Sequence, residues 1–214
     1  MDEQKHETGF QFGNGELNSS HRDLLPAVLE ILEARRAAPK AARIFELGCG
    51  NGSVAKELAS AGYDVSGVDP SKGGIAHAQR NSPTLKLEEG SAYDDLAKLY
   101  GRFPVVLSLE VVEHVYSPRK YAATLYDLVE PGGAAILSTP YHGYWKNLAL
   151  AATGKMDAHF TALWDHGHIK FWSMKTLHCL LEEAGFEDIA FRRVGRIPIF
   201  AKSMIAIARK GSSR

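Results

Sequence analysis

Short apolar runs alternate with segments of helical periodicity along most of this chain of 214 residues. The apolar runs lie at residues 42–47, 64–68, 85–87, 105–109 and 134–138, the last after the expected turn Pro131-Gly132-Gly133. The helical patterns lie at residues 54–61, 73–80, 94–100 and 118–129. A strand, a helix and a second strand form a parallel, right-handed unit, because the crossover packs back onto the sheet. The alternation therefore predicts a doubly wound α/β fold with helices on both faces of the sheet.

The C-terminal part of the chain follows a different pattern. A helix predicted over residues 175–184 is followed by two extended stretches, 186–194 and 202–209, joined by a turn that contains Arg196 and Pro198. Two strands joined by a short turn pair in antiparallel fashion. We therefore expect a seven-stranded, mostly parallel sheet that ends in an antiparallel hairpin.

The domain organisation is predicted from the same patterns. A polar segment, residues 1–20, is expected to be flexible, and an amphipathic helix over 22–38 opens a single domain, 21–214. One long segment, residues 141–171, has no strand or helix assigned to it and is rich in aromatic and histidine side chains. A connection of that length in a compact domain is usually functional. We expect it to be an insertion that covers the substrate.

The composition disfavours several classes of protein. Lys plus Arg and Asp plus Glu each total 25, and no stripe of basic residues offers the footprint of a nucleic-acid binder. We find neither an apolar signal-peptide core nor an apolar run long enough to span a membrane, so a cytoplasmic protein is expected. Cys49 and Cys179 are predicted to be free thiols, since a disulfide at Cys49 would obstruct the glycine loop described next. The oligomeric state is not indicated.

A glycine-rich loop follows the first predicted strand, in the motif Glu46-Leu47-Gly48-Cys49-Gly50-Asn51-Gly52. Alternate glycines between a strand and a helix let the backbone approach a ligand where side chains would collide. Asp69 stands at the end of the next strand, where a carboxylate accepts hydrogen bonds from ribose hydroxyls. The pair predicts a site for a nucleoside-containing ligand.

A dinucleotide such as NAD is the rival ligand for this loop. In its fingerprint the third glycine stands three positions after the second, where this chain has Ser53, and glycine occupies position 52 instead. Glu46 would also repel a pyrophosphate, whereas it complements the ammonium or sulfonium group of S-adenosylmethionine. The loop therefore favours the methyl donor.

These motifs resemble those of the class I S-adenosylmethionine-dependent methyltransferases. The resemblance covers residues 40–140 and also rests on Gly67-Val68-Asp69-Pro70-Ser71, Gly90-Ser91-Ala92-Tyr93 and Pro131-Gly132-Gly133. It implies a Rossmann-like methyltransferase fold. It also implies the contacts to the cofactor. Glu46, Gly48, Cys49 and Gly50 would face the methionine moiety, Asp69 the ribose, and Ser91, Ala92 and Tyr93 the adenine. Leu109 would form the pocket floor, and Pro70 is a further cofactor-binding candidate.

A narrower resemblance is to the O-methyltransferases of ubiquinone biosynthesis, which act on catechol-type rings. It rests on residues 109–115, Leu-Glu-Val-Val-Glu-His-Val, and on Gly167-His168. The stretches 138–143 and 170–173 depart from the better-known members. The acceptor therefore cannot simply be inherited from that group.

Glu110, Glu113 and His114 have the spacing i, i+3, i+4, which brings three side chains together if the segment is helical. Such ligands suit Mg²⁺, Mn²⁺ or Zn²⁺, and a cation can bind a catecholate and lower its pKa. The resemblance adds weight to this divalent cation site. In the alternative, the two glutamates orient the backbone and His114 packs beside the cofactor or acts as a base without metal. His168 and His142 are further candidates for a base or ligand.

Aromatic side chains surround these candidates in the sequence. They suit either the wall of a pocket for a flat ring or the core of the inserted segment, and they are Tyr141, Tyr144, Trp145, Trp164, Phe171 and Trp172. Phe12, His21 and Arg22 are candidates for a lid over the cofactor, the alternative being a frayed tail and a solvated helix start.

The sequence thus predicts a methyltransferase with a small-molecule acceptor. The leading hypothesis is O-methylation of a hydroxylated aromatic or quinone-like metabolite, with His114, Glu110 and His168 as the catalytic candidates. N-methylation of a small amine or heterocycle is the near alternative. A subunit that binds S-adenosylmethionine without catalysis and regulates a partner is the alternative from another class.

Overall fold

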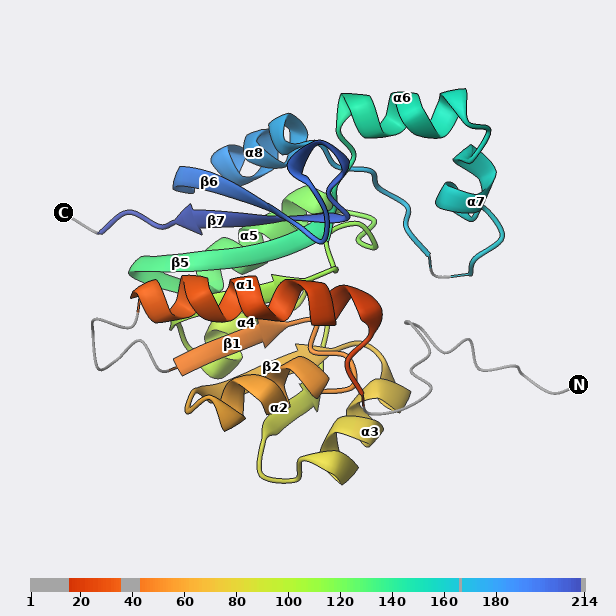
Figure 1. Cartoon of the computed structure of the whole chain (residues 1–214). Coiled ribbons are helices and arrows are strands. Elements are labelled where there is room, and N and C mark those ends of the chain that lie inside the picture. Colours follow the sequence, from red (N-terminus) through yellow and green to blue (C-terminus); the bar gives the residue numbers. More distant parts are fainter. Residues whose placement is uncertain (1–15, 36–42, 166, 213–214) are drawn as a thin grey trace, which may run out of the picture.

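A seven-stranded sheet forms the centre of the computed structural model, which describes residues 16–35, 43–165 and 167–212 (Figure 1). The strands are β1 (Arg43–Leu47), β2 (Asp64–Asp69), β3 (Lys86–Glu89), β4 (Phe103–Leu109), β5 (Val129–Pro140), β6 (Glu187–Val194) and β7 (Ser203–Arg209). Their order is β3-β2-β1-β4-β5-β7-β6, and β7 runs antiparallel to both of its neighbours. The predicted mostly parallel sheet with a C-terminal antiparallel hairpin is confirmed.

Helices cover both faces of this sheet. They are α1 (Ser19–Arg35), α2 (Ser53–Ser60), α3 (Lys72–Asn81), α4 (Leu96–Tyr100), α5 (Pro118–Leu128) and α8 (Met174–Glu183). The apolar residues of α1, α2 and α3 belong to one buried cluster and those of α4, α5 and α8 to the other. In Figure 1, α1 crosses in front of the strands and α5 lies behind them. The doubly wound arrangement is therefore confirmed.

The central strands are apolar almost throughout because both of their faces are covered. Phe45 on β1 and Val106 on β4 pack into the cluster that contains α5. Their neighbours Ile44 and Leu107 pack into the cluster that contains α1, on the opposite face of the sheet. One polar exception is Ser108 on β4, whose hydroxyl donates to Leu47 O at 2.7 Å and accepts from the Tyr121 hydroxyl at 2.8 Å. This bonding satisfies the buried polar groups between the sheet and α5.

One strand boundary differs from the prediction. Pro131-Gly132-Gly133 is not a turn before the strand but lies inside β5, which already begins at Val129. The pairing with β4 is irregular there, and Gly132 has a φ of 80°. Backbone bonds of 3.0 Å join Gly132 N to Lys210 O and Lys210 N to Gly133 O. Long-range bonds to Lys210, the residue directly after β7, therefore outweigh the local turn signal.

The segment 141–171 is not irregular throughout, contrary to expectation. It contains α6 (Tyr144–Ala152) and α7 (Met156–Phe160), which stand beyond the ends of the strands in Figure 1. We call α6, α7 and the chain between them the cap. The N-terminal helix begins at Ser19 rather than at residue 22. Phe12 and most of the expected flexible segment lie outside the described residues. In the described part of the chain no helix is long and apolar enough to cross a membrane.

Candidate functional site

The glycine loop turns the chain from β1 into α2 at the carboxyl end of the sheet. Gly48 N and Cys49 N both donate to Val68 O on β2, at 2.8 and 3.0 Å. Gly48, Gly50 and Gly52 have φ values of 88°, 52° and 73°, which side chains rarely tolerate. A Cβ added at Gly48 would also collide with the Val111 side chain. Glycine is therefore required here both by conformation and by space.

Asp69 ends β2 and shapes this loop. Its Oδ2 accepts from Gly50 N at 2.9 Å, and its Oδ1 accepts from Ser71 N at 2.8 Å. Burial raises the pKa of the Asp69 carboxyl, and the two backbone bonds oppose that shift. Each carboxylate oxygen has a second lone pair. Asp69 can thus hold the loop and still accept hydrogen bonds from a ligand.

Glu46 lies beside Asp69 at the neighbouring strand end but deeper. Its side chain is 2% exposed, and burial, with the charge of Asp69 as a second cause, raises its pKa well above the usual range. Its Oε2 has no hydrogen-bond partner among the described residues. Two close carboxylates and an unpaired buried oxygen favour a ligand with a positive group. Glu46 and Cys49, which is also buried, do not themselves line the cavity described next.

A cavity of about 1200 Å³ extends from the glycine loop to the cap. The predicted donor-binding residues that line it are Gly48, Gly50, Asp69, Pro70, Ser91, Ala92, Tyr93 and Leu109. His21 on α1 lines it as well, whereas the other lid candidate in the described chain, Arg22, does not. The structure thus brings these residues to one space, and their individual roles stay predictions.

The segment after β4 forms a turn and not the helical turn that the i, i+3, i+4 spacing requires. Glu110 has a φ of 55°, and His114 N donates to Val111 O at 2.9 Å. Glu110 turns towards β5, where its Oε1 accepts from Ser138 Oγ at 2.9 Å. Burial raises the pKa of the Glu110 carboxyl to about 7, against the opposing effect of its hydrogen bonds. Glu110 therefore stands apart from the other two predicted metal ligands.

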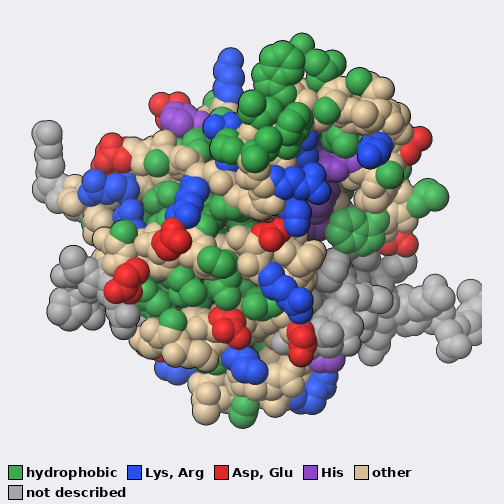
Figure 2. Space-filling view, in the orientation of Figure 1, with side chains coloured by type: hydrophobic (Ala, Val, Ile, Leu, Met, Phe, Trp, Pro, Cys, Tyr) green, Lys and Arg blue, Asp and Glu red, His purple; other side chains and the backbone are tan. Residues whose placement is uncertain are grey.

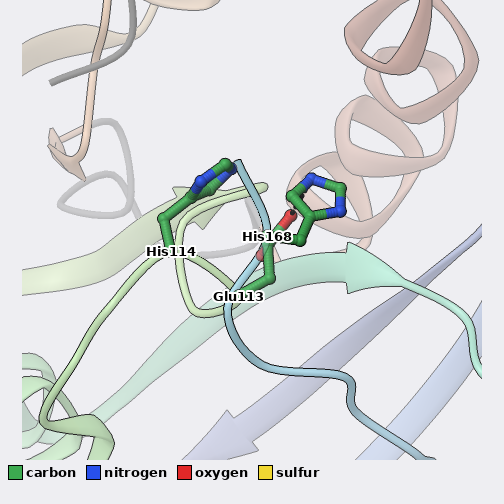
Figure 3. A group of neighbouring side chains, drawn as sticks. All are labelled: Glu113, His114 and His168. Atoms are coloured by element: carbon green, nitrogen blue, oxygen red, sulfur yellow. Dashed lines mark ion pairs between the residues drawn. The ribbon is translucent and has the colours of Figure 1, made fainter. Parts of the chain in front are cut away.

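Glu113 and His114 are joined instead by His168 from the chain after the cap (Figure 3). The potential ligand atoms of these three residues all lie within 4.8 Å of one another, and His168 Nε2 lies 3.9 Å from Glu113 Oε1. Glu113 is 1% exposed, and neither of its carboxylate oxygens has a hydrogen-bond partner in the described structure. Burial, with the charge of Glu110 as a second cause, raises its pKa well above the usual range. A buried carboxylate in this state suits a cation or a proton donor.

Backbone bonds hold His168 in this position. Ile169 N and Lys170 N both donate to Glu113 O, at 2.9 and 3.0 Å, and His114 Nδ1 lies 3.1 Å from Gly167 O. Trp172 Nε1 donates to Val112 O at 3.1 Å. The chain on both sides of His168 is thus fastened to the turn after β4. Burial, then the charges of His114 and His159, lower the pKa of His168 to about 4, so its imidazole is neutral at pH 7.

The six aromatic candidates have three different locations. Trp164 and Phe171 line the cavity. Tyr141 and Trp172 belong to the hydrophobic core, and Tyr144 and Trp145 on α6 are 73% and 61% exposed. The sequence did not single out the cavity-lining Val111, Lys146, Arg196, Phe200 and Lys202, because no local motif marks them.

His142 lines the cavity between the rings of Phe160 on α7 and Phe171, and its burial leads to a prediction about pH. It stacks on Phe160 at 5.8 Å and meets Phe171 edge-on at 5.1 Å. Burial, as the largest cause, lowers its pKa from 6.5 to about 4. In the unfolded chain the imidazole binds a proton below about pH 6.5, whereas in the folded chain it does so only below about pH 4. Between these values the unfolded state binds more protons, so the free energy of unfolding falls as the pH falls.

His142→Phe should therefore lessen the fall in unfolding free energy between pH 7 and pH 5, by at most about 2 kcal/mol. Urea unfolding of both proteins at the two pH values measures the difference. His178→Phe, at a half-exposed histidine on α8, is the matched control for the exchange of a histidine for a phenylalanine. An equal dependence in His142→Phe and the unmodified protein would contradict the assignment.

Comparisons with known proteins identify the family of this chain. A model of the methyltransferase domain family matches residues 19–190. Two curated relatives, each named ubiquinone biosynthesis O-methyltransferase, come from Azorhizobium caulinodans and Cereibacter sphaeroides. They are 36% identical over 164 residues and 33% identical over 155 residues, which are 72% and 69% of this chain. The chain spans 63% and 61% of these relatives, slightly less than two thirds of their length.

Solved structures share the fold at lower identity. Magnesium protoporphyrin IX methyltransferase from Synechocystis, solved with bound SAH, superposes with a TM-score of 0.65 at 22% identity, covering 93% of this chain and 90% of that one. A possible histamine N-methyltransferase from Thermotoga maritima gives a TM-score of 0.63 at 17% identity, with 89% and 91% covered. From the sheet order, the glycine loop and the family match over residues 19–190, we conclude that this chain belongs to the methyltransferase domain family.

Proposed function

We propose that this chain binds S-adenosylmethionine at the glycine loop and transfers its methyl group to an oxygen of a hydroxylated aromatic or quinone-like small molecule. The observation that carries the proposal is the continuity of the cavity. It runs from Asp69 past Leu109 to His114 and His168, so that a donor and an acceptor can lie end to end. Methyl transfer needs such an in-line approach, and the protein contributes mainly by positioning the two reactants.

The donor half of the cavity fits an adenosylmethionine. Asp69 has lone pairs for two ribose hydroxyls, and the adjoining Ser91–Tyr93 segment offers a polar and aromatic edge for adenine. The raised pKa of Glu46 and its unpaired Oε2 support a positive ligand group near β1. A pyrophosphate would meet these carboxylates unfavourably. These features support the methyl donor over a dinucleotide.

The acceptor half offers groups that deprotonate or orient an oxygen. Glu113, His114 and His168 supply one carboxylate and two imidazoles, a mixed O/N set that suits Mn²⁺ or Zn²⁺ and also accepts Mg²⁺. A divalent cation held by these three would lower the pKa of a phenol bound beside it. Glu110, bonded to Ser138, is proposed to shape the turn and to act on the cluster through its charge. The neutral His168 is itself a base within reach of the cavity.

The names of the two curated relatives support oxygen as the nucleophile and a quinone-like ring as the acceptor. Trp164, Phe171 and His142 offer flat surfaces for such a ring in the cavity. The cap, which contributes Ala149, Leu150 and His159 to the lining, is proposed to cover the acceptor. Cys49 and Cys179 are free thiols, which supports a reducing compartment such as the cytoplasm.

Calorimetry followed by a turnover assay tests the proposal. We expect S-adenosylmethionine to bind at micromolar concentrations and NAD not to compete. We then expect release of S-adenosylhomocysteine with small catechols and not with small amines. Turnover with amines alone would favour N-methylation, and donor binding without release over a broad panel would favour a regulatory subunit. Preferential binding of NAD would overturn the proposal.

A further inference from the structure

Basic side chains line the part of the cavity that is bounded by the cap and by the connection between β6 and β7. They are Lys146 on α6, Lys155 between α6 and α7, and Arg196 and Lys202 between β6 and β7. Figure 2 shows blue Lys and Arg side chains beside purple His side chains at a hollow below the apolar upper part of the molecule. The whole chain has no net charge, so this concentration of positive charge is local.

Two of these cations, Lys146 and Arg196, have no carboxylate partner among the described residues. Lys202 is paired, with its Nζ 2.6 Å from Asp23 Oδ2 on α1. Lys146 Nζ donates instead to two neutral backbone oxygens, Tyr141 O at 2.8 Å and Lys202 O at 3.3 Å. These use two of the three donors of an ammonium group. No carboxylate of the described chain lies within ion-pair distance of Lys146 or Arg196.

Lys146 and Arg196 are close enough to affect each other. Burial lowers the pKa of Lys146 to about 8, and the charge of Arg196 is the second cause of this shift. The one carboxylate that favours its charge is Glu110, which is bonded to Ser138. The ammonium is thus partly dehydrated and faces a like charge. A bound anion would remove both penalties, since one acid group could meet the lysine and the guanidinium together.

We propose that Lys146 and Arg196 form a subsite for a carboxylate substituent of the methyl acceptor, on the ring that lies between them and the Glu113, His114 and His168 cluster. The inference rests on the proposed methyl transfer at this cavity. The arginine fork matches a carboxylate in geometry, and the compact lysine supplies a second donor. A single negative charge suits this wall better than a phosphate of about two charges, because Lys146 and Arg196 supply two positive charges and the charge of Glu110 already acts on Lys146.

Matched acceptors and matched variants test the subsite. The acceptors are 3,4-dihydroxybenzoate and 4-methylcatechol, which carry a carboxylate and a methyl group, respectively, at the same position of the catechol ring. The variants are Lys146→Gln and Arg196→Gln, and the control is Lys175→Gln on α8, which removes the same charge away from the cavity lining. Steady-state kinetics at pH 7 give kcat and KM for each pair.

We expect the unmodified protein to favour the carboxylate acceptor at least tenfold in kcat/KM. Each variant should lower kcat/KM for 3,4-dihydroxybenzoate tenfold or more, chiefly through KM, because it loses a hydrogen bond to the charged carboxylate. The value of kcat/KM for 4-methylcatechol should change less than threefold, because this compound has no carboxylate to lose. Lys175→Gln should change neither. Equal losses with both acceptors, or no preference in the unmodified protein, would overturn the inference.

Calorimetry separates this result from a failure of the proposed function. Both ring compounds are titrated into the protein saturated with S-adenosylhomocysteine, so the measurement needs no turnover. Tighter binding of 3,4-dihydroxybenzoate that is lost in Lys146→Gln supports the subsite even where no methyl transfer is detected. Absence of that tighter binding overturns the inference. A variant that instead weakens the binding of S-adenosylmethionine also overturns it, because the cations would then bind the carboxylate of the donor.

Discussion

Asp69→Ala is expected to weaken the binding of S-adenosylmethionine at least 100-fold. The carboxylate is proposed to accept hydrogen bonds from the two ribose hydroxyls, and each bond to a charged group contributes about 1.5–3 kcal/mol. The substitution also removes the acceptor of Gly50 N and Ser71 N, which hold the glycine loop against the end of β2. Loss of the ligand contacts and loosening of the loop act in the same direction.

Calorimetry with S-adenosylmethionine measures this change, and thermal unfolding shows whether the variant is folded. Asp64→Ala is the matched control, since it removes an exposed carboxylate at the other end of the same strand. It should leave the dissociation constant within a factor of about two, consistent with its distance from the site. A folded Asp69→Ala protein that binds the donor within threefold of the unmodified protein would refute the assignment of Asp69.

Glu113→Gln is expected to lower kcat by about 100-fold to 1000-fold while leaving the affinity for the methyl donor nearly unchanged. The amide keeps the size of the side chain but removes the negative charge that the two imidazoles face. Because burial raises the pKa of Glu113 well above its usual range, the folded protein disfavours its charged form. The melting temperature should therefore stay the same or rise, which distinguishes a catalytic loss from misfolding.

Single-turnover methylation of a catechol acceptor, with and without a chelator, measures this effect. Glu57→Gln, at an exposed glutamate on α2, is the control for the loss of one charge. If a cation takes part, chelation should reduce the unmodified protein to the level of Glu113→Gln, and Mn²⁺ should restore it. Full activity in Glu113→Gln would sink the role of the cluster, whereas a loss in the variant with insensitivity to chelation would leave His114 or His168 as a base without metal.

Much of the fold could be predicted from the sequence because its signals are local. Apolar runs such as 105–109 and helical periods such as 118–129 specify strands and helices within a few residues of their observed bounds. The exceptions have long-range causes. Pro131-Gly132-Gly133 reads as a turn, but pairing with Lys210 places it in β5. The sequence pattern did not predict the cap helices, because α6 exposes apolar side chains and α7 is only five residues long.

The proposed donor side of the site could likewise be predicted from the sequence, because a strand, a glycine loop and the end of the next strand are neighbours wherever parallel strands pair. Gly50 and Asp69 meet through that rule alone. The acceptor side was decided by the tertiary structure. Backbone bonds to Glu113 O bring His168 to His114, and the turn after β4 directs Glu110 away from both. Lys146 and Arg196 come to one cavity from a cap helix and a hairpin connection, and no sequence spacing encodes such a meeting. Contacts between distant segments depend on how the whole chain packs, which a local pattern does not record.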